Sequence, residues 1–478
     1  MAESLKSKTV KGTLWSSVER FSVQGIMFVV MIIMARMLTP EDYGLVGMIT
    51  IFVAVSQSLI DSGFSQALIR KQDRTETDNS TVFYFNIAVG AALYTILFLC
   101  APIISDFYGE PQLTPVTRAI GLCIVFNSLA VVQRALLTVR LDFKTQAKAT
   151  LIGAVVSGAA GVTMAYTGFG VWAIVTQQVV NLALVTLFLW VFSHWKPIWA
   201  YSWKSFRELF SFGSKLLASG LIDTLYRNMY LIVIGKVFKA SDLGYYTRAH
   251  QFSDFASSNI TGIFQRVSYP VLCTIQDDDA RLADVYRRLL KTAAFIIFPL
   301  LTGLSAVSKP VILTFLTEKW LFSASILQIL CISQMWYPIH SINLNLLQVK
   351  GRSDLFLRLE IIKKIVGVSI LCITINFGII TLCWGVFTNS IIALIINTYY
   401  TGKLINLGFI KQMKDLLPTL ILSYAVGITV YVTVTYIQMA PPLALIIGII
   451  EGVSLYVIIA KILRFSEFAE LVSIIRRK

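Results

Sequence analysis

The sequence contains a series of apolar stretches that are each long enough to cross a membrane as a helix. Such a helix needs about 20 mostly apolar residues. Membrane β-strands are shorter and alternate in hydropathy, so these long runs exclude a β-barrel. We therefore expect an all-α integral membrane protein with about 14 transmembrane helices. The predicted spans are approximately residues 12–37, 45–62, 81–103, 114–133, 148–167, 170–192, 211–238, 244–268, 290–315, 322–349, 360–380, 382–404, 416–437 and 442–463.

The composition supports this interpretation. The chain has 478 residues, of which 56% are hydrophobic and only 14% charged, which lies outside the usual range for soluble domains. Fourteen spans account for about 280 residues, so little chain remains for a soluble domain. The first apolar stretch carries Glu19 and Arg20 and is too long for the apolar core of a signal peptide, so we expect a retained first helix.

The net charge of +15 raises the question of nucleic acid binding, and the positions of the basic residues answer it. We place 31 of the 41 Lys and Arg residues in every second loop, which is the pattern of the positive-inside rule. This predicts a multi-pass membrane protein with an even number of helices and both termini in the cytoplasm. It also predicts attraction to anionic membrane lipids rather than to nucleic acid.

An internal repeat predicts how the helices are organised. The segment ARMLTPEDYGLVG at 35–47 is followed 200 positions later by GKVFKASDLGYYT at 235–247, in which Asp42 and Gly44 recur as Asp242 and Gly244. A second match relates two outer loops, and its residues are Pro102, Phe107 and Glu110 against Pro310, Phe315 and Glu318. A weaker similarity relates VRLDFK (139–144) to VKGRSD (349–354).

The two copies of the first segment are separated by six predicted helices, an even number, so they point the same way through the membrane. This arrangement is typical of transporters built from two parallel repeats. We predict an N-terminal six-helix bundle at 1–200, a second bundle at 201–405, and two further helices with a cytoplasmic tail at 406–478.

Two stretches also carry a family resemblance. LWSSVERFSVQGIMFVVMIIMARMLTPEDYGLVGM (14–48) and QRALLTVRLDFK (133–144) resemble the bacterial polysaccharide-export flippases, the Wzx-like branch of the superfamily that includes lipid II flippases and MATE exporters. The resemblance implies a flippase, and not an enzyme. It implies transfer of an undecaprenyl-diphosphate-linked oligosaccharide, such as an O-antigen, capsule or exopolysaccharide unit, from the cytoplasmic to the periplasmic leaflet. Glycan assembly proteins are implied as further partners.

Polar residues inside the predicted spans are the candidates for substrate binding, because charge in a membrane is costly. Arg20 and Gln24 lie four residues apart on one face of the first helix, and Asp223 and Arg227 do so on the seventh, with Asn228 adjacent. We expect these residues to line a cavity. The alternatives are that Arg20 extends to the interface and that Arg227 forms an ion pair with Asp223.

Further candidates lie on the eighth and tenth predicted spans. Arg248 could bind a headgroup or anchor the helix at the interface, and Asp254 shares a polar face of the same span. His340 and Asn343 follow Pro338, which can kink a helix, and they could contact sugar or diphosphate or serve a structural role.

Four carboxylates are candidates for ion coupling: Glu19, Asp223, Asp254 and Glu451. Burial raises the pKa of a carboxyl group, so H⁺ or Na⁺ are the expected coupling ions. The alternative is that Glu19 pairs with a nearby base and that Glu451 faces a groove or a partner helix. We predict no cofactor and no metal site, and we expect the six cysteines to be packing residues.

Two other functions remain open from the residues. A MATE-like cation or drug exporter would favour acidic residues in its cavity, whereas the charged candidates for substrate binding here are the basic residues Arg20, Arg227 and Arg248. A membrane polysaccharide polymerase or ligase would need a large outer loop for its catalytic residues, and the longest predicted outer loop runs only from about Ile104 to Leu113. No P-loop motif for ATP is present.

Overall fold

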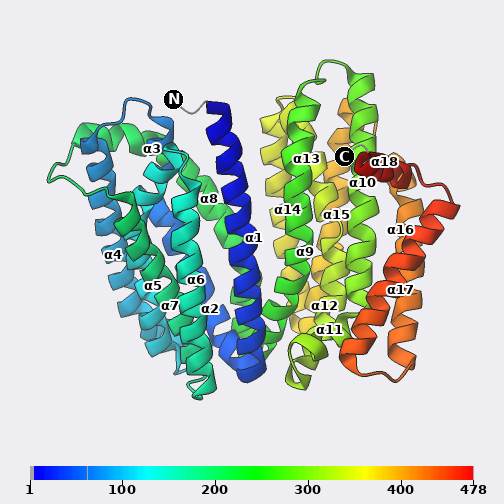
Figure 1. Ribbon diagram of the computed structural model, residues 1–478, viewed down its shortest axis with the longest axis horizontal. Coiled ribbons are helices and arrows are strands. Elements are labelled where there is room, and N and C mark those ends of the chain that lie inside the picture. Colours follow the sequence, from blue (N-terminus) through cyan, green and yellow to red (C-terminus); the bar gives the residue numbers. More distant parts are fainter. Residues whose placement is uncertain (1–4, 62, 477–478) are drawn as a thin grey trace. The chain divides into compact units, whose positions relative to one another are not determined.

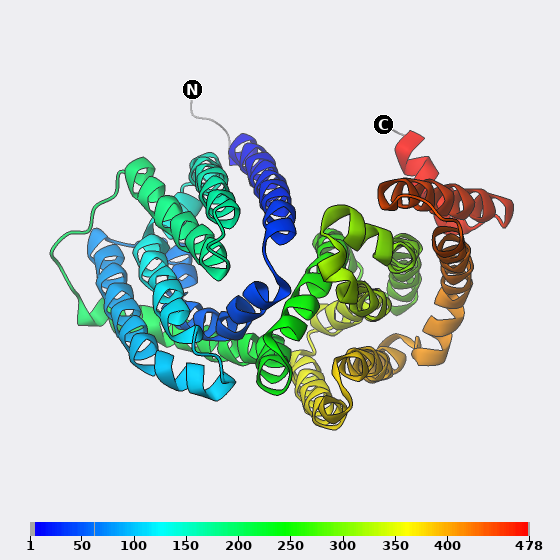
Figure 2. The same cartoon turned by 90° about the horizontal axis from the view of Figure 1, so that it is seen from below.

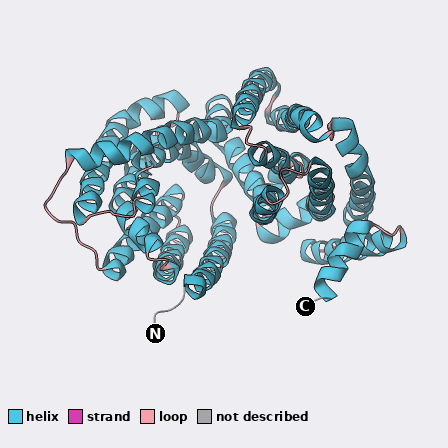
Figure 3. Cartoon of the chain, turned by 90° about the horizontal axis from the view of Figure 1, so that it is seen from above, coloured by secondary structure: helices cyan, strands magenta, loops and turns pink. Residues whose placement is uncertain are grey.

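The computed structural model describes residues 5–61 and 63–476, and every regular element in these residues is a helix (Figures 1 and 3). The chain forms two compact units, Met1–Gly244 and Tyr245–Lys478. Figure 2 shows most helices of each unit nearly end-on, as expected for helices that run side by side through a membrane. The predicted all-α membrane fold is therefore confirmed.

Unit 1 contains eight helices and the start of a ninth. They are α1 (Leu5–Met37), α2 (Pro40–Asp61), α3 (Phe64–Arg70), α4 (Glu76–Tyr108), α5 (Leu113–Val139), α6 (Phe143–Tyr166), α7 (Val171–Ser193), α8 (Trp203–Val237) and α9 (Ala240–Cys273).

Unit 2 contains the rest of α9 and the remaining elements. They are α10 (Asp279–Ala306), α11 (Ser308–Phe315), the 3-10 helix η1 (Glu318–Trp320), α12 (Leu321–Gln334), α13 (Tyr337–Val349), α14 (Ser353–Thr374), the 3-10 helix η2 (Ile375–Phe377), α15 (Ile379–Ile405), α16 (Phe409–Tyr436), α17 (Pro441–Ile462) and α18 (Ser466–Arg476).

Each predicted span corresponds to one helix or to a broken pair. The span at 322–349 is divided into α12 and α13, with Pro338 in the first turn of α13, where a missing N–H costs nothing. The span at 290–315 is divided into α10 and α11 at Val307. Among the described residues, nine stretches are apolar and long enough to cross a membrane, and they include neither α8, α9 nor α14. Arg227, Arg248 and Lys363 lie on these three helices.

Small residues bring the helices of unit 1 together. In this unit α1 packs on α6, α2 on α5 and α8, α4 on α5, and α6 on α7. A Cβ atom at Gly158 of α6 would lie only 2.5 Å from the Val30 side chain of α1. Glycine at that position therefore sets the separation of the two helices, as small residues commonly do in membrane bundles.

Unit 2 is built around α10, which packs on α12, α13 and α16, while α17 packs on α16 and α11. Among its side chains, Tyr286, Phe298 and Trp320 are fully buried. After the last long helix, α18 forms a short amphipathic helix that was not predicted. It contacts α10 through an ion pair of 3.2 Å between Arg288 and Glu470.

The two copies of the first repeated segment have the same helix start. In α2 the Asp42 carboxylate accepts a hydrogen bond from the backbone N–H of Thr39, at 2.8 Å. In α9 the Asp242 carboxylate accepts one from the N–H of Lys239, at 3.3 Å. Each aspartate thus caps its helix near the positive end of the helix dipole.

The weaker sequence similarity also corresponds to one shared turn. Leu141 in VRLDFK and Gly351 in VKGRSD both have left-handed backbone conformations, with φ values of 56° and 66°. In both turns the next residue donates its N–H to the carbonyl five positions back, at 2.9 Å for Asp142 and 2.8 Å for Arg352. This is a Schellman-type helix ending. The repeat predicted from sequence therefore extends to details of the backbone.

Candidate substrate-binding site

The clearest candidate group is an ion pair between Arg227 and Asp223 in the second half of α8. Their side chains are four residues apart, so the helix places them on one face, and Arg227 Nε donates to Asp223 Oδ2 at 2.7 Å. The two side chains are 68% and 47% exposed. Arg227 is ten residues from the end of the helix at Val237, which corresponds to about 15 Å. The ion pair foreseen as one alternative for Arg227 is thus present.

The exposure of Arg227 and Asp223, about 15 Å from the end of α8, has a chemical consequence. A charged pair facing hydrocarbon would lose the hydration of both ions, which costs far more than an exposed ion pair returns. The pair is therefore suited to a face that water or a polar ligand can reach. The neighbouring Asn228 is half-buried and donates to the backbone carbonyl of Thr224 at 2.8 Å, which leaves its carbonyl oxygen for another partner.

The matching stripe on α1 is only partly described. Gln24 is half-buried, and its Oε1 has no hydrogen-bond partner among the described residues. The side chains of Glu19 and Arg20 lie outside the described residues, so their roles stay predictions. Gln24 is thus the described member of the polar stripe predicted on this helix.

The polar face of α9 divides into two rows. Ser253, Ser257 and Thr261 are buried, and Ser257 donates to the carbonyl of Gln334 in α12 at 2.9 Å. This row is therefore a packing surface. The predicted residues Arg248 and Asp254 are half-buried instead.

His340 on α13 makes hydrogen bonds to α15 through both ring nitrogens. Its Nε2 lies 3.1 Å from Ser390 Oγ, and its Nδ1 lies 3.3 Å from Asn397 Nδ2. These bonds join α13 to α15, which is the structural role foreseen as one alternative. Contact with substrate would require at least one of the two bonds to break.

Asn343 belongs to a second buried network. Its Nδ2 donates to Ile339 O at 2.9 Å and to Gln412 Oε1 at 3.1 Å. Its Oδ1 accepts from Thr401 at 2.9 Å and from Gln412 at 3.1 Å. All four hydrogen-bonding positions of the amide are thus occupied by protein, and the side chain is 0% exposed. The network ties together α13, α15 and α16.

Glu451 lies on α17 against α16. Its Oε1 accepts a hydrogen bond from Thr433 at 2.9 Å, while its Oε2 is buried and has no partner in the part of the chain that the structure describes. No basic side chain is recorded within ion-pair distance among these residues.

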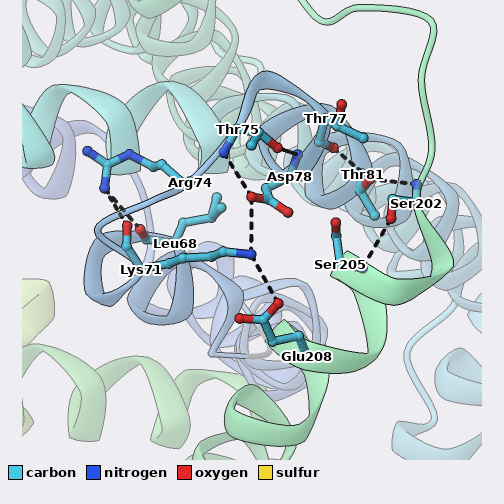
Figure 4. Close-up of polar contacts among 10 residues, drawn as sticks. All are labelled: Leu68, Lys71, Arg74, Thr75, Thr77, Asp78, Thr81, Ser202, Ser205 and Glu208. Atoms are coloured by element: carbon cyan, nitrogen blue, oxygen red, sulfur yellow. Dashed lines mark hydrogen bonds and ion pairs between the residues drawn. The ribbon is translucent and has the colours of Figure 1, made fainter.

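Sequence reasoning missed a cluster where α3, α4 and α8 meet (Figure 4). Lys71 lies 3.2 Å from Asp78 and 3.0 Å from Glu208, and the Asp78 carboxylate also accepts from the backbone N–H of Thr75 at 2.8 Å. Burial of the ammonium opposes its charge, but the hydrogen bonds to Glu208 and Asp78 outweigh this effect and raise the pKa of Lys71. Arg74 binds the carbonyls of Lys71 and Leu68 at the end of α3. Lys71 and Arg74 therefore make structural contacts within the protein.

A second missed pair lies on α14. Lys363 donates to Glu360 one turn earlier, and the two side chains are only 13% and 29% exposed. The sequence carried a signal here, because both residues fall in the predicted span 360–380, where charge is costly.

Comparison with known proteins shows the family to which the chain belongs. The family described as "Polysaccharide biosynthesis protein" matches residues 33–325. The teichuronic acid biosynthesis protein TuaB of Bacillus subtilis (strain 168) is 25% identical over 459 residues, which cover 95% of both chains. The lipopolysaccharide biosynthesis protein WzxC of Escherichia coli (strain K12) is 26% identical over 442 residues, 89% of both chains.

Solved structures show the same fold. The lipid II flippase MurJ in an inward closed conformation has a TM-score of 0.76 at 16% identity, covering 96% of this chain and 100% of that chain. An inward-facing multidrug resistance MATE transporter has a TM-score of 0.61 at 14% identity, covering 81% and 98%. The chain is thus a multi-pass membrane protein that belongs to the polysaccharide biosynthesis protein family and has the fold shared by MurJ and the MATE transporters.

Proposed function

We propose that the protein flips a polyprenyl-diphosphate-linked oligosaccharide from the cytoplasmic to the periplasmic leaflet of the bacterial inner membrane. Support comes from the family match and from relatives named for teichuronic acid and lipopolysaccharide biosynthesis, which align with nearly the whole chain. The lipid carrier, the direction of transfer and the alternating-access mechanism are parts of this proposal.

The observation that carries the proposal is the exposed Arg227–Asp223 pair on α8. A guanidinium presents several N–H donors in a plane that matches phosphate oxygens. A diphosphate bears the opposite charge and would replace Asp223 as the partner of Arg227. The adjacent Asn228 adds a carbonyl oxygen that suits a sugar hydroxyl. A small organic cation would instead be repelled by Arg227, so the MATE-like export function is less well matched.

This exchange gives a physical basis for ion coupling. With no substrate bound, Asp223 neutralises Arg227 across 2.7 Å. When a diphosphate takes the guanidinium, the Asp223 carboxylate is left without its cation. The carboxylate can then take a coupling cation, H⁺ or Na⁺, in place of the guanidinium. Release of the substrate on the other side reverses the exchange, so the ion and the lipid move in coupled steps.

Leaflet-resolved labelling of lipid-linked oligosaccharide tests the proposal. In cells that depend on this protein for export, Arg227→Ala should cause the labelled lipid to accumulate in the cytoplasmic leaflet at an unchanged level of membrane-inserted protein. Arg118→Ala is the matched control, because Arg118 packs over the Phe98 ring at 4.3 Å and takes no part in the proposed site. Normal delivery by Arg227→Ala would remove Arg227 from the mechanism. Normal delivery after deletion of the whole protein would refute the function itself.

A further inference from the structure

The connection between α7 and α8, residues 194–202, is held firmly against the first turns of α4. The backbone N–H of Ile198 donates to Ser80 Oγ at 2.9 Å, and that of Ser202 donates to Thr81 Oγ1 at 3.0 Å. The indole of Trp195, which is 6% exposed, donates to Glu76 Oε2 at 2.6 Å. The chain path of this connection is therefore fixed by three bonds to α4.

The other side of the same segment exposes large aromatic and aliphatic side chains. Trp199 is 98% exposed and Trp203 is 56% exposed, and Ile198 and Tyr201 are also exposed. Scattered apolar residues on a surface need no explanation, but four within six positions of a well-held segment form a patch that calls for a partner. The ring of Trp199 is stacked on Tyr84 at 6.0 Å, which fixes its place on this patch.

Basic residues surround the aromatic patch. Lys196, Lys204 and Arg207 are all exposed, and Arg207 lies 5.7 Å from the Trp203 ring centre. Within the described ranges, no carboxylate lies within ion-pair distance of these three cations. The nearby Glu208 instead pairs with Lys71. The patch is thus aromatic at its centre and positive at its edge.

The position of the segment identifies the partner. It connects the last residue of α7, Ser193, to the first residue of α8, Trp203. A connection between two membrane helices lies at the membrane surface. Trp and Tyr side chains concentrate at this interface, and Lys and Arg beside it attract anionic headgroups. We propose that residues 196–207 form an interfacial anchor that binds anionic phospholipid.

The anchor has a structural consequence that goes beyond the proposed transport function. Because the same segment is bonded to α4 and leads directly into α8, lipid bound there holds the start of α8 at a fixed depth. Arg227 lies on that helix, 24 residues after its first residue Trp203. Anionic lipid at the anchor therefore stabilises the placement of the helix that carries the candidate site.

Quenching of tryptophan fluorescence by brominated lipid tests the anchor without any transport assay. The full-length protein is reconstituted in bilayers that contain brominated phosphatidylglycerol or brominated phosphatidylcholine at equal mole fractions. The difference between wild type and Trp199→Phe isolates the share of the signal that belongs to Trp199. We expect that share to be quenched in both bilayers, and more strongly by the anionic lipid. A preference of about fivefold per engaged cation is the expected scale.

Charge variants complete the test. The triple variant Lys196→Gln, Lys204→Gln, Arg207→Gln should lose the preference for the anionic lipid while retaining quenching of Trp199. The matched control triple Arg281→Gln, Arg358→Gln, Lys414→Gln removes exposed cations from unit 2 and should keep the preference. Equal quenching by the two lipids in the wild-type background would overturn the anionic-lipid assignment. No quenching of Trp199 by either lipid would overturn the anchor and point to a protein partner on this surface.

Discussion

Gly44 and Gly244 pack reciprocally where the first turns of α2 and α9 cross. A Cβ atom added at Gly44 would lie 1.8 Å from the carbonyl oxygen of Ala240, and one added at Gly244 would lie 1.8 Å from the carbonyl oxygen of Pro40. The four residues are related pairwise by the same offset of 200 positions that relates the repeated segments. The two copies of the repeated segment therefore contact each other, and each glycine leaves room for the first residue of the other helix.

We predict that Gly44→Ala destabilises the protein, because the new methyl group meets a backbone carbonyl that cannot turn away. Overpacking of this kind costs about 1–3 kcal/mol. The expected result is a lower melting temperature and a lower yield of monodisperse protein in detergent, measured by thermal challenge followed by size-exclusion chromatography. Gly244→Ala should behave alike because its geometry is reciprocal.

Two other glycines supply the control. Gly262 and Gly303 lie within α9 and α10, and a Cβ atom at either would have no described atom within 4 Å. Alanine loses less conformational entropy than glycine when the helix forms. The free energy of unfolding should therefore be unchanged or higher by about 0.5–1 kcal/mol. A Gly44→Ala protein as stable as Gly262→Ala would contradict the reciprocal packing.

The repeat and the membrane helices could be predicted because each depends on short-range information. Apolar runs identify spans one at a time, and the shared turn at Leu141 and Gly351 follows from residues within one segment. The broken span at Pro338 was likewise readable from a single proline. What the sequence could not supply is the partner of each polar side chain when that partner is distant in the chain.

The buried networks illustrate this limit. Lys71 meets Glu208 across 137 positions, and Asn343 meets Gln412 across 69. No local pattern predicts such pairs, so Asn343 was grouped with substrate-binding residues although its amide is fully used by protein. Arg227 and Asp223 were predictable as a pair because one helix places both on the same face.

We predict that Lys71→Met destabilises unit 1, because it leaves the Asp78 carboxylate, 3% exposed, without its cation. An unsatisfied buried charged group costs about 1–3 kcal/mol or more. The double variant Lys71→Met, Asp78→Asn should recover part of the loss, since the remaining amide carries no charge. Thermal stability of the purified proteins measures both effects. A double variant as unstable as the sum of the two single variants would show that the ion pair is not the cause.

The same cluster predicts a dependence on alkaline pH. The pKa of Lys71 is raised above its ordinary value of 10.5, so the folded state binds the proton more tightly than the unfolded state. Its contribution to stability is fully present below that value and is lost as the pH rises through the folded-state pKa. The stability advantage of wild type over Lys71→Met should therefore shrink above about pH 10.5 and stay constant near neutrality. A difference that already narrows near neutral pH would contradict this assignment.

Asn343 and Arg227 should give opposite phenotypes. Asn343→Ala removes partners from Gln412 and Thr401 in a fully buried network, so we expect loss of folded protein, with about 1–3 kcal/mol for each buried group left unsatisfied. Arg227→Ala removes an exposed pair and should leave the folded yield unchanged while transport is lost. Folded yield and leaflet-resolved transport are measured on the same membranes. An Asn343→Ala protein that folds normally and fails only in transport would restore Asn343 to the substrate site.

Glu451→Gln tests whether the carboxyl group on α17 takes part in ion coupling. A glutamine retains an acceptor for the Thr433 hydroxyl, which now lies 2.9 Å from Glu451 Oε1, so folding should be preserved. Because Oε2 is buried without a partner among the described residues, this carboxyl oxygen is available to a coupling ion. We expect the variant to flatten the dependence of transport on external pH while retaining basal transport in reconstituted vesicles.

Asp223→Asn in parallel distinguishes the two carboxylates, since it should also weaken substrate binding by changing the charge around Arg227. If transport by Glu451→Gln follows the wild-type pH profile, Glu451 is a structural residue that joins α16 to α17, and coupling must be sought at Asp223.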